Sequence, residues 1–110
     1  MSHPPGGRDT AEAGQLADRI AAAVAGCPAV AALADGPVAT YLPGRVVTGV
    51  AVRDDLVVVA VVARHGPPLA EAAGQVRAAV AQVAPGLAVD VRIDDIQLPD
   101  AGAGRREAGP

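Results

Sequence analysis

The sequence predicts an α+β fold, a two-layer sandwich in which two helices pack on one face of a three- to four-stranded sheet. Two amphipathic segments with a period near 3.6 residues predict the helices. Two valine-rich runs joined by a turn, and a later run that alternates every second residue, predict the strands. The elements follow one another in the order α-β-β-α-β, and packing both helices against one sheet face buries the apolar side of each.

The first helix is expected over residues 11–26. Thr10 is a suitable N-cap, the helix dipole favours Glu12 in the first turn, and Gly26 and Pro28 end the segment. Its apolar residues recur at the spacing of a single buried stripe, which comprises Leu16, Ile20, Ala23, Val24 and Cys27.

The middle of the chain predicts a β-hairpin. The runs 45–52 and 56–64 meet at a turn over residues 53–55. Before them, the short apolar stretches 30–33 and 38–42 are candidates for additional strands. In the first long run we expect one face to carry Val46, Thr48, Val50 and Val52.

The second helix and the last strand follow the turn-forming residues 65–68. The helix has an apolar stripe and ends before Pro85-Gly86. The last strand is expected over 87–93, with apolar residues facing inward and with Asp90, Arg92 and Asp94 facing water. The helical stripe comprises Leu69, Ala72, Val76, Val80 and Val83.

The strand 56–63 is apolar at every position, which is typical of a central strand that is covered on both faces. Because two helices cover only one face, we expect about half of its side chains to form an exposed apolar contact surface. The candidate residues on this strand are Val57, Val59 and Val61.

Tyr41 and Arg45 complete the candidate interaction surface. Tyr41 is the only aromatic residue in the chain, and tyrosine and arginine are enriched at binding hot spots. The alternative is that Tyr41 caps the core beside a turn.

Composition indicates one soluble domain over 10–98 between disordered tails at 1–9 and 99–110, which are rich in Pro and Gly. The net charge is −3 and the nine basic residues are dispersed arginines, so nucleic acid is not expected as a partner. One cysteine, no signal peptide and no long apolar run predict a cytoplasmic protein that does not insert into a membrane.

No catalytic, cofactor-binding or metal site is predicted. Asp54-Asp55 are expected to form a turn, Asp90, Asp94 and Asp95 a solvated charge ladder, and His65 the end of a strand. Cys27 lies at the C-terminal end of a helix, where the dipole disfavours a thiolate. We therefore expect its side chain to be buried and to pack in the core.

The segment 17–95 resembles the alkaline shock protein family of Gram-positive bacteria, in a short actinobacterial form. The resemblance is carried by IAAAVAGCPAVAAL (20–33), TYLPGRVVTGVAV (40–52), LVVVAVVARHG (56–66) and PGLAVDVRIDDI (85–96). It implies a non-enzymatic α+β protein of cell-envelope homeostasis. It also implies two kinds of partner, further copies of the chain and a small membrane-anchor protein that holds it peripherally at the membrane.

Two other functions remain open. A small-ligand-binding or regulatory module would need a concave pocket with a few polar groups beside the strand 56–63. A hydrolase or metalloenzyme would need His65 to lie close to Asp54, Asp55, Asp90 or Asp95.

Overall fold

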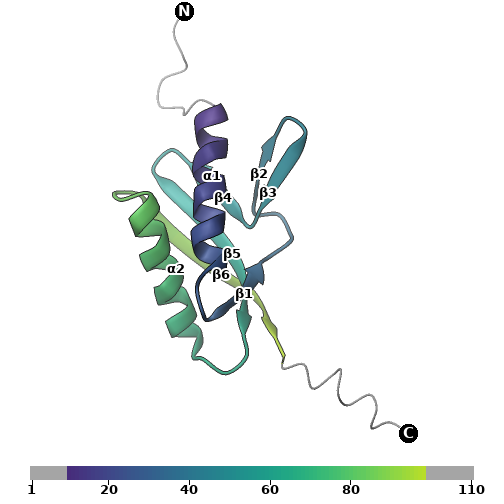
Figure 1. Cartoon of the computed structure of the whole chain (residues 1–110), viewed down its shortest axis with the longest axis vertical. Coiled ribbons are helices and arrows are strands. Elements are labelled where there is room, and N and C mark those ends of the chain that lie inside the picture. Colours follow the sequence, from purple (N-terminus) through teal and green to yellow (C-terminus); the bar gives the residue numbers. More distant parts are fainter. Residues whose placement is uncertain (1–9, 99–110) are drawn as a thin grey trace, which may run out of the picture.

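The computed structural model describes residues 10–98, which form two helices and six strands (Figure 1). Helix α1 spans Thr10–Ala25 and helix α2 spans Leu69–Val83. The strands are β1 (Val30–Leu33), β2 (Ala39–Leu42), β3 (Arg45–Thr48), β4 (Val50–Arg53), β5 (Leu56–Arg64) and β6 (Ala88–Gln97). The predicted tails at 1–9 and 99–110 lie outside the described residues.

Strand β5 is the centre of a four-stranded sheet, as its unbroken apolar sequence predicts. β4 pairs antiparallel with its first half, and β1 pairs antiparallel with its second half along the same edge. β6 runs parallel to β5 along the whole of the other edge. Helix α2 connects these two parallel strands, which need a crossover of this kind.

Both helices pack on one face of this sheet and against each other, which confirms the predicted two-layer arrangement (Figure 1). The stripes predicted for the two helices supply the core: Ile20 and Val24 come from α1, and Val76 and Val80 from α2. The core is aliphatic, because the chain contains no Phe or Trp.

The predicted strand 45–52 is wrong as a single strand, because Gly49 divides it into β3 and β4. Gly49 has φ +83°, a left-handed conformation that side chains disfavour. Its N–H donates to the Val38 carbonyl at 2.8 Å and its carbonyl accepts from Ala60 N–H at 2.9 Å. The alternation therefore changes phase: Val46 is exposed, whereas Val47 and Val50 are both buried.

β2 and β3 form a separate two-stranded sheet, the β2–β3 hairpin (Figure 1). The Pro43-Gly44 turn, with φ +81° at Gly44, is typical of a type II turn. An isolated hairpin is only marginally stable in water, so the β2–β3 hairpin depends on its contacts with the rest of the domain. The Thr40 hydroxyl donates to the Val50 carbonyl at 2.7 Å, which fixes the hairpin to β4.

Candidate interaction surface

Val57, Val59 and Val61 lie in the core and not on a contact surface. All three are 0% exposed, on the sheet face that packs against α1 and α2. The expectation that they contact a partner is therefore wrong. In a strand that is apolar at every position, the sequence does not distinguish the side chains that face the helices from those that face away.

The opposite face of β5 is also closed, although both helices lie on the other side. Val58 is 5% exposed and Ala60 is 1% exposed. Val58 lies between Ala51 of β4 and Asp90 of β6, and Ala60 lies beside Arg92. Both residues lie in the middle strand of the sheet and are buried, so the exposed apolar surface predicted for 56–63 does not form.

Tyr41 does lie on the surface, at the β2–β3 hairpin. It is 70% exposed and pairs directly across the strands with Val46, which is 49% exposed. Such cross-strand neighbours present their side chains on the same face, close together. The alternative prediction, that Tyr41 caps the core, is wrong. The hairpin instead presents an apolar cross-strand pair to solvent.

Arg45 holds the hairpin against α1. Its guanidinium donates two hydrogen bonds to the Asp18 carboxylate, Nη1 to Oδ1 at 2.9 Å and Nη2 to Oδ2 at 2.8 Å. These bonds, and the charge of Arg45, lower the pKa of Asp18. On the same side of the hairpin, Leu42 packs against the core cluster. Arg45 therefore orients the hairpin face that carries Tyr41.

Sequence reasoning missed a second surface, the outer edge of β6. Within residues 10–98, β6 pairs with β5 alone. Asp90 and Arg92 are half exposed on the sheet face away from the helices, and Arg92 Nε lies 3.6 Å from Asp90 Oδ2. The alternating signs of these residues are visible in the sequence, but an edge position is not.

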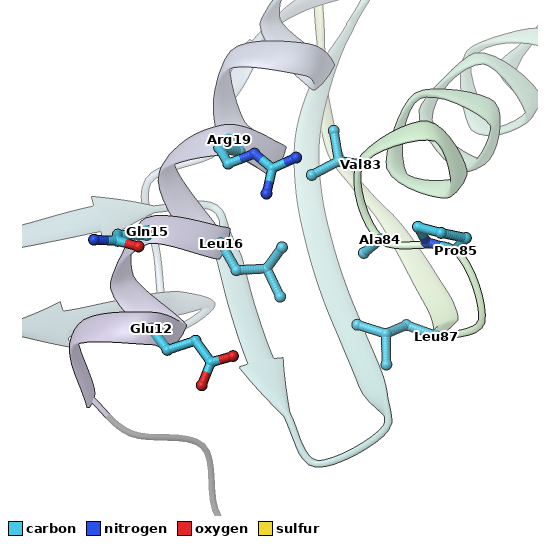
Figure 2. A pocket seen from close by; sticks show the side chains of 8 residues that line it. All are labelled: Glu12, Gln15, Leu16, Arg19, Val83, Ala84, Pro85 and Leu87. Atoms are coloured by element: carbon cyan, nitrogen blue, oxygen red, sulfur yellow. The ribbon is translucent and has the colours of Figure 1, made fainter.

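A cavity of about 380 Å³ lies between the first turns of α1 and the end of α2 (Figure 2). Figure 2 shows the Arg19 guanidinium and the side chains of Leu16, Val83 and Leu87 around it. The full lining comprises Glu12, Gln15, Leu16, Arg19, Val83, Ala84, Pro85 and Leu87. This cavity lies between the helices, whereas the small-ligand alternative required one beside the strand 56–63.

The residues weighed for catalysis are not brought together. Asp54-Asp55 precede β5 and His65 follows it, so the nine residues of that strand separate them by roughly 30 Å. Asp90 lies beside Val58 and Asp95 beside Val62, at different levels of the sheet. Within 10–98, no cluster of three or more His, Cys, Asp or Glu residues is placed to hold a metal ion.

Cys27 is buried directly after α1, as predicted. Its thiol lies 3.5 Å from the Gln75 carbonyl oxygen and 3.7 Å from that of Ala23. Burial raises the pKa of the thiol, because the thiolate loses hydration. Cys27 therefore packs between α1 and α2.

Comparison of the chain with protein-family models, with curated proteins and with solved structures finds no match. The fold itself places the chain among α+β proteins. Neither α1 nor α2 has the length and apolar character required to span a bilayer.

Proposed function

We propose that this chain is a non-enzymatic association module that acts through self-association or a partner protein. The observation that carries the proposal is the exposed Tyr41–Val46 pair on the β2–β3 hairpin. Tyrosine supplies a large contact area with few rotatable bonds, which favours it at the centre of interfaces. The ion pair of Arg45 with Asp18 supports this role, because it orients the hairpin before any partner binds.

The resemblance to the alkaline shock protein family supports a role in cell-envelope homeostasis. On this proposal the protein is cytoplasmic and reaches the membrane through a separate anchor protein. The lack of a membrane-spanning helix within residues 10–98 is compatible with that arrangement.

The test compares the full chain with the double variant Tyr41→Ser, Val46→Ser. Sedimentation velocity of the purified proteins measures self-association, and capture from soluble and membrane fractions reports partners. We expect the double variant to lose either the oligomer or a captured protein that the wild type shows. Arg77→Ala, an exposed change on α2, should retain it. A monomeric wild type whose captured proteins match those of the double variant would contradict the proposal.

A second candidate function is binding of a small ligand in the cavity between α1 and α2. The Arg19 guanidinium would pair with a small carboxylate whose apolar tail lies against Leu16 and Leu87, on the side of the cavity away from the Glu12 carboxylate (Figure 2). Octanoate is a suitable probe in NMR titrations of the full chain. Shifts of the Leu16 and Leu87 methyl signals that disappear in Arg19→Ala would support this function, and unchanged spectra would exclude octanoate-like ligands.

A further inference from the structure

The outer edge of β6 has free backbone groups within the described part of the chain. The Ala88 N–H donates to the Asp55 carbonyl at 3.0 Å, toward β5. Because successive residues of a strand direct their N–H and C=O groups to opposite edges, Asp90 and Arg92 also bond toward β5. Val89, Val91 and Ile93 therefore direct theirs outward, where a further strand can pair.

The side chains of this edge are sorted by face. Val89, Val91 and Ile93 are half-buried on the helix side, whereas Asp90 and Arg92 are exposed on the other side. Between Ala88 and Ile93 this exposed face thus has one acid and one base, two residues apart, and Asp94 follows where the β5–β6 register shifts. In an antiparallel second copy the acid and the base follow in the opposite order. The acid of each copy can then lie opposite the base of the other.

We propose that β6 is a self-association edge, on which a second copy of this chain pairs antiparallel about a twofold axis at Val91. The inference rests on the proposed function, because it requires self-association, and it adds the β6 edge as a surface separate from the Tyr41–Val46 pair. In this register Asp90 of each copy lies opposite Arg92 of the other, in non-hydrogen-bonded pairs where side chains are closest. The outward groups of Val91 face each other, and those of Val89 face Ile93, which gives about six backbone hydrogen bonds.

Charge selects this register over its neighbours. The outward backbone groups of two copies pair only when an odd-numbered residue of one lies opposite an odd-numbered residue of the other. The sum of two paired residue numbers can therefore change only by two from one register to the next. A step in one direction places Asp90 opposite Asp90, and a step in the other places Arg92 opposite Arg92. Like charges directly opposite each other destabilise a sheet. Of these three registers, the one centred on Val91 converts both contacts into ion pairs.

Charges on edge strands also serve to prevent association. Protection of that kind works best with one sign of charge, because two copies then repel. Here both signs occur, and the row of Val89, Val91 and Ile93 would continue the apolar layer beneath the helices across the twofold axis. An isologous contact of this kind closes at two copies, because each β6 edge is used once.

The test uses sedimentation velocity of the full chain and of charge variants. Asp90→Arg and Arg92→Asp each place like charges opposite each other twice, and we expect each to raise the dimer dissociation constant about tenfold or more. The double variant Asp90→Arg, Arg92→Asp restores both ion pairs with reversed signs, so it should dimerise like the wild type. The two single variants, when mixed, are complementary to each other and should form a heterodimer. Arg77→Ala, an exposed change on α2 that leaves β6 unchanged, should dimerise normally.

Sedimentation of the wild type and the single variants distinguishes a wrong β6 contact from a wrong proposed function. If the wild type associates and both single variants associate equally well, the β6 edge is wrong but self-association stands. A wild type that remains monomeric at high micromolar concentration overturns the β6 contact, and the role of the chain then depends on a partner protein. Recovery of the dimer in the double variant and in the mixture supports the edge, because a merely structural role for these exposed side chains would not restore it.

Discussion

At the scale of single residues, Gly49 has the largest influence on where the candidate surface lies. Its left-handed backbone ends β3 and begins β4, so that the chain leaves the hairpin and enters the main sheet. A Cβ at this position would lie 2.8 Å from Leu33 Cβ and 2.9 Å from the Ala60 carbonyl oxygen. Both contacts are closer than packed atoms tolerate, and the carbonyl belongs to the central strand. Gly49 is therefore required for both conformation and space.

We expect Gly49→Ala to lower the free energy of unfolding by about 2–4 kcal/mol, from backbone strain and from the close contacts. Urea denaturation followed by circular dichroism measures the change. Gly74→Ala is the matched control, because no atom lies within 4 Å of its added Cβ and the site is in α2. There alanine should stabilise the protein by about 0.5–1 kcal/mol. Equal effects at the two sites would contradict the role assigned to Gly49.

At the scale of elements, the Gln75 side chain attaches α2 to the loop after α1. Gln75 Oε1 accepts a hydrogen bond from the Ala29 N–H at 2.8 Å, and Ala29 is itself buried. Gln75 Nε2 lies 3.3 Å from Glu71 Oε2 in the preceding turn of the helix. The amide thus satisfies a buried backbone donor that no strand pairs, and it fixes the height of α2 relative to the sheet.

Gln75→Ala should destabilise the protein by about 1–3 kcal/mol, because the buried Ala29 N–H loses its acceptor. Amide exchange at Ala29, measured by NMR, should quicken more than the global change in stability accounts for. Gln82→Ala, an exposed glutamine of the same helix, should change stability by less than about 0.5 kcal/mol. An unchanged exchange rate at Ala29 would show that another group satisfies this donor.

The two helices and the central strand could be predicted because each has a strong local signal, whereas the predicted order α-β-β-α-β did not include all five strands between the helices. The helical stripes around Ile20 and Val76, and the unbroken run of β5, each specify their type and their burial. The break at Gly49 was missed because the β-branched residues Thr48 and Val50 flank it, so the sequence reads as one continuous strand. A glycine within a strand pattern is the one local signal of such a break.

The candidate surface was less predictable, because exposure depends on neighbours that are distant in the sequence. Tyr41 and Arg45 could be singled out by residue type, but the pairing of Arg45 with Asp18 joins segments that only the fold brings together. Val58 and Ala60 are closed by flanking strands, including β6, whose parallel place beside β5 has no local signal. The edge position of β6 was unpredictable for the same reason.

At the scale of the whole molecule, Cys27 reports on the packing of the two helices against the sheet. The thiol lies where the end of α1, the middle of α2 and the approach to β1 meet. The core around it consists of small aliphatic side chains, so a domain of this size has a thin margin of stability. Reagents should reach the thiol only when this packing opens.

We expect alkylation of native Cys27 by iodoacetamide to be slow, and to accelerate with urea in parallel with loss of the circular dichroism signal. The pKa of the thiol is raised above its ordinary value of 9.0 in the folded state, so folding favours the protonated form. This contribution to stability is complete below the unfolded pKa and is lost as pH rises through the folded pKa. As the pH rises above 9.0, the urea midpoint of the wild type should therefore fall more than that of Cys27→Ala. Fast alkylation without urea, or identical midpoint changes in both proteins, would show that the thiol is accessible in the folded state and that α1 and α2 do not enclose it.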